Sequence, residues 1–204
     1  MKVYAESNFV LELVLEQEQH AACSSLVDLA EREEVTLALP AYSLFEPFTT
    51  LRSRKAKRQE LHDNLQKELR EIARTQGFAA EVAASPLPAL LVRSAQEAAV
   101  RFDGVVDRLA RVAQLLPLTA SVFDEVGRVR AAYELQFPDA IVLACVMSDL
   151  DGARPSCFLN RNTEDFDDPQ IVDALAARSC KMLGSFANGL QYVLANLRNP
   201  ANEP

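Results

Sequence analysis

The sequence predicts an α/β fold with a central parallel sheet. Short apolar, β-prone segments recur at Lys2–Ala5, Val35–Leu39, Ser156–Leu159 and Lys181–Leu183. Helical sequence separates successive segments, as parallel sheets require, because each parallel connection has to return across the sheet. We therefore expect these segments to be strands of one parallel sheet.

Apolar residues at helical spacing predict the connections between the strands. The expected helices cover residues 8–16, the segment that ends at Glu34, 42–74, 95–116, 121–133, 139–147 and 185–197. No strand is predicted between residues 52 and 133, so this stretch is interpreted as a helical insertion in one domain that covers residues 1–198. Residues 199–204 are expected to form a flexible tail.

The composition is typical of a globular protein that stays in the cytoplasm. Of 204 residues, 49% are hydrophobic and 25% are charged, the balance of an ordinary folded domain. No apolar run approaches the roughly 20 residues needed to cross a membrane, and the first residues lack the apolar stretch of a signal peptide. We expect a cytoplasmic protein with no membrane partner.

Several kinds of catalytic site are excluded by residue type. His20 and His62 are the only histidines, and they lie far apart in the sequence, which argues against a Ser-His-Asp triad and against histidine-rich metal sites. The four cysteines form no C-x-x-C pair and lie in apolar surroundings, so we expect buried free thiols. Glycine-rich phosphate-binding motifs are absent from the sequence. Catalysis would therefore depend on carboxylates.

The charge distribution leaves room for a nucleic-acid partner. The net charge is −8, but the stretch from Arg52 to Arg74 carries a local excess of four positive charges. A local basic face matters more for phosphate contact than the total charge. The candidate RNA-binding residues are Arg52, Arg54, Lys55 and Arg58. An exposed, solvated helix is the alternative interpretation.

Four acidic residues lie where a predicted strand or turn gives way to a helix: Glu6, Glu46, Asp139 and Asp165. The carboxyl ends of parallel strands meet at one edge of a sheet, where ligands of α/β folds bind. Carboxylates gathered there repel one another unless a divalent cation, usually Mg²⁺ or Mn²⁺, lies between them. The pattern therefore predicts a metal-dependent phosphodiester hydrolase.

Each acid also has a structural alternative. Asp139 follows a proline and has the position of an ordinary helix N-cap, and Asp165 has the position of a cap or of a solvated residue. Glu46 is flanked by apolar residues and could pair with an arginine. Glu6 is the hardest of the four to explain by a structural role, because a carboxylate directly after a core strand needs a partner. Taken together, their placement favours a shared site.

The segments around these acids resemble the PIN-domain nucleases. The resemblance rests on residues 3–11, 39–46, 139–144 and 158–166, in that order along the chain. It implies a three-layer α/β/α PIN-like fold and Mg²⁺- or Mn²⁺-dependent endoribonuclease cleavage of single-stranded RNA. Many members are toxins of toxin–antitoxin modules, which implies an antitoxin as a protein partner. The chain departs from the family at Glu6, where aspartate is usual, and at Asn162, where many relatives carry an acid.

On this interpretation the ion lowers the pKa of a water and neutralises charge on the phosphoryl oxygens. The residues expected to hold it are Glu6, Asp139 and Asp165. Glu46 would bind a second ion or orient the attacking water. Hydrogen bonds that fix these carboxylates are expected from Ser7, Asn8 and Asn162.

A second function remains open from the sequence. A degenerate site would leave a PIN-like protein that binds a protein or RNA without cleaving it. The apolar stripe at Leu109, Val112, Leu115 and Leu116 has to be buried. Its partner is the α/β core, a second copy of the chain in a homodimer, or another protein.

Overall fold

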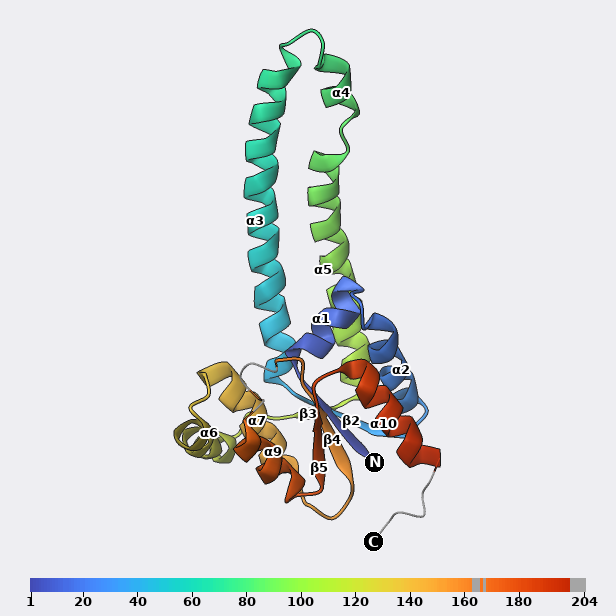
Figure 1. Cartoon of the computed structure of the whole chain (residues 1–204), viewed down its shortest axis with the longest axis vertical. Helices are drawn as coiled ribbons and strands as arrows, with labels where there is room; N and C mark the ends of the chain where they lie inside the picture. The colour runs from blue at the N-terminus through green and yellow to red at the C-terminus, as the bar shows by residue number, and fades with distance from the viewer. Residues whose placement is uncertain (163–165, 167, 199–204) are drawn as a thin grey trace. The chain divides into compact units, whose positions relative to one another are not determined.

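The protein contains a five-stranded, all-parallel sheet with helices on both faces, as seen in a computed structural model that describes residues 1–162, 166 and 168–198 (Figure 1). The strand order is β3-β2-β1-β4-β5. The strands are β1 (Lys2–Ala5), β2 (Thr36–Pro40), β3 (Gln114–Leu116), β4 (Ser156–Leu159) and β5 (Cys180–Leu183). The predicted α/β fold with a central parallel sheet is therefore confirmed.

The strand β3 corrects the expectation that residues 52–133 contain no strand. It follows α5 (Leu87–Val112) almost directly and pairs in parallel with β2 at the edge of the sheet. Of its three residues only Leu116 is buried. Helical periodicity runs up to the strand and hides it, because three residues with one buried side chain carry too little alternation to predict a strand.

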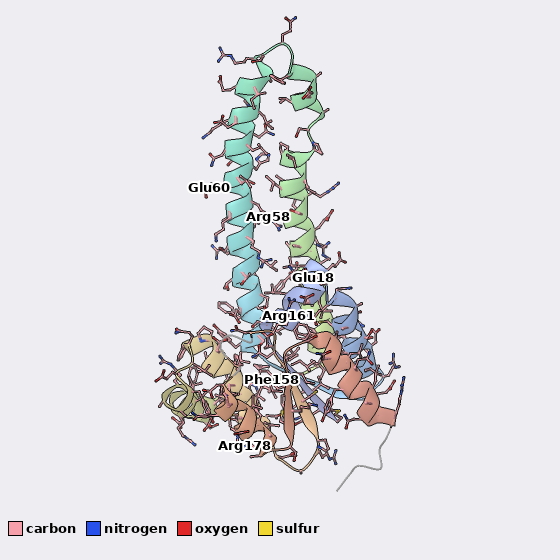
Figure 2. The ribbon with its side chains drawn as sticks, in the orientation of Figure 1. Glu18, Arg58, Glu60, Phe158, Arg161 and Arg178 are labelled. Atoms are coloured by element: carbon pink, nitrogen blue, oxygen red, sulfur yellow. The ribbon has the colours of Figure 1, made fainter. Side chains whose placement is uncertain are left out.

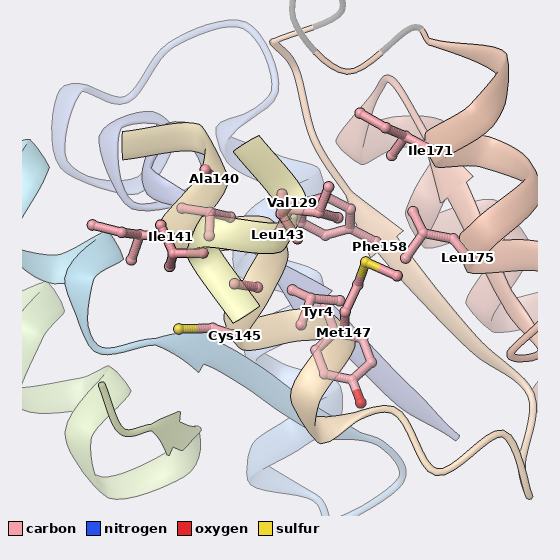
Figure 3. Close-up of a cluster of buried hydrophobic side chains, with 14 of the residues drawn as sticks. Tyr4, Val129, Ala140, Ile141, Leu143, Cys145, Met147, Phe158, Ile171 and Leu175 are labelled. Atoms are coloured by element: carbon pink, nitrogen blue, oxygen red, sulfur yellow. The ribbon is translucent and has the colours of Figure 1, made fainter. Parts of the chain in front are cut away.

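One face of the sheet packs against α7 (Phe137–Asp149) and α9 (Pro169–Ala176), and α6 (Ala120–Tyr133) packs against α7. Tyr4 of β1 and Phe158 of β4 extend into this layer, where they belong to one cluster of buried side chains with Leu143 of α7 and Leu175 of α9 (Figure 3). The helix predicted at residues 139–147 is α7, whose residues from Ala140 to Met147 are all buried. This layer holds α7 with its N-terminus toward the carboxyl edge of the sheet.

The other face carries α1 (Ser7–Leu15), α2 (His20–Glu31) and α10 (Phe186–Arg198). The rings of Phe9 and Phe186 meet edge to face, with centroids 5.5 Å apart, which joins α1 to α10. Gly189 lets α10 approach β4, because a Cβ at that position would lie 2.5 Å from Cδ2 of Leu159. With helices on both faces, the strands are nearly continuous apolar runs, as parallel sheets demand.

The opposite, amino edge of the sheet is tied by a polar network at the end of α7. Asp149 accepts hydrogen bonds from Nζ of Lys2 at 2.7 Å and from the hydroxyl of Tyr4 at 2.8 Å. Gln114 of β3 donates to the other oxygen of the same carboxylate at 3.3 Å. Asp149 therefore fixes α7 against β1 and β3.

The four cysteines are free and buried, as expected. They are Cys23, Cys145, Cys157 and Cys180. Burial raises the pKa of the Cys145 and Cys180 thiols to about 11, so both are neutral near pH 7 and pack as small apolar groups.

The chain divides into two compact units. Residues 1–47 and the described residues between 105 and 198 form the α/β unit, and residues 48–104 form a helical unit. The helical unit contains most of α3 (Tyr42–Ala73), all of α4 (Ala79–Ala84) and the first part of α5. Residues 105–133, which include β3 and α6, therefore belong to the α/β unit. No helix in the described part of the chain is long and apolar enough to cross a membrane.

Candidate metal centre at the carboxyl edge of the sheet

The order of the strands creates a switch point between β1 and β4. The chain adds β2 and β3 on one side of β1 and then returns to place β4 on the other side. In open α/β sheets, ligands bind at such a point, beyond the carboxyl ends of the strands. Glu6 follows β1 there, and Asn160 follows β4.

Glu6 is the N-cap of α1. Its carboxylate accepts hydrogen bonds from the backbone N–H of Asn8 at 2.7 Å and of Arg161 at 3.5 Å. The residue is buried, and burial raises the pKa of the Glu6 carboxyl to about 7 against the opposing effect of these hydrogen bonds. The charge on Glu46 raises it further. The hydrogen-bond partners of the Glu6 carboxylate are therefore backbone N–H groups, and the acidic side chain of Glu46 lies close by.

Glu46 is joined to the same place through Ser7. It is the fifth residue of α3, which begins shortly after β2. The buried hydroxyl of Ser7 donates to Oε2 of Glu46 at 2.5 Å. Since Ser7 directly follows Glu6, this hydrogen bond holds the Glu46 carboxylate beside the end of β1.

Asp139 approaches from α7 and is held by Asn162. The N-cap of α7 is Gln136, and Asp139 is the third helical residue, so the N-cap role considered for Asp139 is wrong. The side-chain amide of Asn162 donates to Oδ1 of Asp139 at 3.2 Å. The first turn of α7 stabilises a negative charge at this position.

Tyr42 shows that Asp139 and Glu46 share one electrostatic environment. Burial raises the pKa of the Tyr42 phenol, and the negative charges of Glu46 and Asp139 raise it further. The phenol therefore lies within electrostatic range of both carboxylates. The hydrogen bonds from Ser7 to Glu46 and from Asn162 to Asp139 connect these two acids to the segments that follow β1 and β4.

An ion pair that the sequence analysis missed supports the loop after β4. Arg161 pairs through Nη1 with Oε1 of Glu12, whose side chain is 1% exposed (Figure 2 labels Arg161 beside Glu18). Glu12 also accepts from the backbone N–H of Gln19 at 2.9 Å. The one available sequence signal is a charged Glu12 within the apolar segment of α1. The pair fixes the backbone of Arg161, which donates to Glu6.

Asn160 completes the loop. Its Oδ1 accepts from the backbone N–H of Asn162 at 2.7 Å, while its buried Nδ2 has no hydrogen-bond partner among the described residues. Asp165 lies outside the described residues. The capping role considered for it belongs to Asp168, which accepts from the backbone N–H of Gln170 at the start of α9.

The described acids could contribute to holding a hydrated ion, but they do not surround a metal ion on their own. Within the described residues, no three histidine, cysteine, aspartate or glutamate side chains are placed to hold one metal ion. Mg²⁺, however, keeps several waters and is commonly bound by one or two carboxylates together with substrate phosphates. Glu6, Glu46 and Asp139 supply the oxygen ligands that Mg²⁺ and Mn²⁺ prefer.

The predicted RNA-binding residues lie in the helical unit. Arg52, Arg54, Lys55 and Arg58 follow one another on α3, and all four line a groove between α3 and α5. The acidic cluster belongs to the α/β unit. The basic groove and the acidic cluster therefore belong to different units.

Comparisons with protein-family models, with curated proteins and with solved structures give no significant match to this chain.

Proposed function

We propose that the protein is a divalent-metal-dependent endoribonuclease that hydrolyses single-stranded RNA. The observation that carries the proposal is that Glu46 lies beside Glu6 at the end of β1, while Asp139 and Glu46 both lie near the phenol of Tyr42. These acids come from three separate elements, and Ser7 and Asn162 connect them to the ends of β1 and β4.

The electrostatics favour a cation. Glu6 is buried beside the charge of Glu46, and both conditions make its ionised form costly. A Mg²⁺ or Mn²⁺ ion would offset that cost by supplying the missing positive charge. The carboxylates would hold the ion in part through water, with Asp165 as a further ligand from the segment outside the described residues.

The ion would supply an activated water and neutralise charge on the phosphoryl oxygens. Residues of the chain would orient the carboxylates that hold the ion. Ser7 restricts the rotation of Glu46, and Asn162 restricts that of Asp139, as hydrogen-bonded supports of metal ligands do. The Glu12–Arg161 pair holds the loop that carries Asn162, so the carboxylates keep their positions without the substrate.

The proposal is tested by titrating Mn²⁺ into the protein and following its melting temperature, with cleavage of a labelled single-stranded RNA measured in parallel. We expect Mn²⁺ to raise the melting temperature and to support cleavage. Asp139→Asn and Glu46→Gln should abolish both effects. Asp124→Asn, an exposed acid on α6, removes the same charge and should leave both unchanged. Cleavage that persists in Asp139→Asn with EDTA present would reject the proposal.

The second candidate is a binding module without catalysis, and one observation favours it. Glu6 already caps α1 through the backbone of Asn8, so its carboxylate has a role in the fold without an ion. RNA binding that neither needs Mn²⁺ nor leads to cleavage, with no thermal stabilisation by the metal, would assign this function instead.

A further inference from the structure

A groove of about 300 Å³ lies between α3 and α5, wholly within the helical unit. Ala95, Ala98 and Ala99 of α5 line its apolar side. They recur at one-turn spacing, and their short side chains leave the space open between the two helices. The volume is at the lower end of the range for small-ligand sites. It is suited to one flat group and is too small for a folded partner segment.

Two phenylalanine rings also line this groove. The rings of Phe48 on α3 and Phe102 on α5 lie with centroids 6.0 Å apart and planes inclined by 42°. Phe48 is 47% exposed. The helical unit buries no large apolar side chain in its described structure, so these rings are not part of a closed core. They offer an accessible aromatic surface.

The α3 side of the groove is strongly basic. From residue 52 to residue 58 the sequence has five cations and no acid, whereas from residue 59 to residue 74 it has three cations and four acids. Arg52, Arg54, Lys55 and Arg58 line the groove, and none of them forms an ion pair with a described residue. Figure 2 labels Arg58 on this helix. The positive charge is therefore concentrated where the rings are accessible.

We propose that this groove binds an unpaired nucleotide of single-stranded RNA, with its base against Phe48 and Phe102 and its phosphates at the α3 cations. Proteins that bind single strands combine aromatic stacking surfaces with a basic track in this way. A base held in a duplex cannot reach such a groove, so the site selects unpaired RNA. Asp103 at the rim can accept a hydrogen bond from an exocyclic amine of the base.

An acidic peptide is the competing occupant, and the groove favours it less. Carboxylates would satisfy the cations, but the paired rings and the small volume provide no place for a helix with several apolar anchors. The proposal rests on the proposed function only in taking RNA as the polymer. Binding is measured without metal, so the failure of either proposal leaves the other testable.

The first experiment measures binding of a fluorescent uridylate decamer by anisotropy in EDTA, where cleavage does not occur. Phe48→Leu and Phe102→Leu keep the side chain apolar and remove the ring, and each should weaken binding by about five- to tenfold. Phe78→Leu, an exposed ring in the same unit outside the groove, is the matched control and should bind as the unchanged protein does. Circular dichroism establishes that all three variants remain helical.

The second experiment separates base contact from charge. A decamer of abasic residues should bind about tenfold more weakly than uridylate if stacking contributes. Arg54→Gln with Lys55→Gln and Arg58→Gln should reduce the salt slope of log K by about 2. Lys67→Gln with Arg70→Gln and Arg74→Gln removes the same charge further along α3 and should have a much smaller effect.

Three outcomes would overturn the proposal. Equal affinity for the abasic and uridylate decamers would show that no base enters the groove. Equal loss in Phe78→Leu and Phe48→Leu would show that the effect is not local. Complete displacement of RNA by polyglutamate at matched charge, with no preference for bases, would identify a general anion surface or an acidic-peptide site.

Discussion

Arg161, directly after Asn160 in the loop beyond β4, forms an ion pair with Glu12, which is almost fully buried in α1. The backbone N–H of the same Arg161 donates to Glu6. One residue therefore neutralises a buried charge with its side chain and contacts the candidate metal centre with its backbone. The stability of the fold and the geometry of the centre depend on the same loop.

Replacing Arg161 should destabilise the protein because it leaves Glu12 buried without its partner. We expect Arg161→Ala to lower the free energy of unfolding by about 3 kcal/mol, measured by urea denaturation. Arg74→Ala breaks an exposed pair with Glu71 on α3 and should cost less than about 1 kcal/mol. If the double variant Glu12→Leu with Arg161→Ala is no more stable than Arg161→Ala alone, the unpaired charge is not the cause.

Removing the hydroxyl of Ser7 should weaken metal binding without unfolding the protein. Ser7→Ala removes the hydrogen bond that Ser7 donates to the Glu46 carboxylate, and the loss of such a support typically costs about 10–100-fold in metal affinity. Calorimetric titration with Mn²⁺ measures the change. Ser25→Ala on α2 removes a hydroxyl that bonds only one turn back, to the carbonyl of Ala21. Equal Mn²⁺ affinity in the two variants would separate Ser7 from the centre.

Glu6 predicts a specific dependence of stability on pH when no metal is present. Its pKa is raised from 4.5 to about 7 in the folded protein, chiefly by burial. Between these values the folded state binds the proton more tightly than the unfolded state, so the free energy of unfolding falls as the pH rises. The contribution is complete below pH 4.5 and is lost as the pH passes through about 7.

Glu6→Gln should flatten this part of the stability curve, measured by denaturation in EDTA between pH 4.5 and pH 8. Mn²⁺ should restore stability more at pH 8 than at pH 5, because only the ionised carboxylate attracts the cation. Glu16→Gln, a change at the C-cap of α1, serves as the control for the loss of one carboxyl group. An unchanged slope in Glu6→Gln would mean that another group titrates in this range.

Gly189 should tolerate no side chain. In Gly189→Ala the new Cβ would lie 2.5 Å from the buried Cδ2 of Leu159, and we expect a loss of about 1–3 kcal/mol from overpacking. Gly127→Ala on α6 meets open space and should stabilise the protein by up to about 1 kcal/mol. Thermal denaturation compares the two. Equal melting temperatures would mean that α10 can move away from β4 at no cost.

The parts of the fold that the sequence predicted are those with strong local patterns. β1 and β4 are adjacent inner strands and are buried almost throughout, so each contains an apolar run, Val3–Ala5 in β1 and Cys157–Leu159 in β4. β3 was missed because this edge strand buries only one residue, Leu116. The helical spacing of apolar residues in α5 also continues into it.

The candidate site divides in the same way. The positions of Glu6 and Asn162 at the carboxyl edge follow from the ends of β1 and β4. The pair between Glu12 and Arg161 joins residues 149 positions apart, and no local sequence pattern predicts such a contact. The groove of the helical unit depends on the alanines of α5 facing α3, which a basic stretch on α3 alone does not reveal. The metal and RNA roles of these residues stay predictions.

The central position of β1 has a consequence for how the protein is made. β1 pairs with β4 in a register that aligns Lys2 with Ser156. At about 5–20 residues per second, the ribosome therefore synthesises β4 roughly 8–30 s after β1, and one edge of β1 has no partner strand during that time. Until then that edge of the nascent chain is open to pairing with other chains. The loop that donates to Glu6 also arrives with β4. The acidic cluster therefore assembles only after β4 and the loop that follows it have been synthesised, and any activity it supports begins after that point.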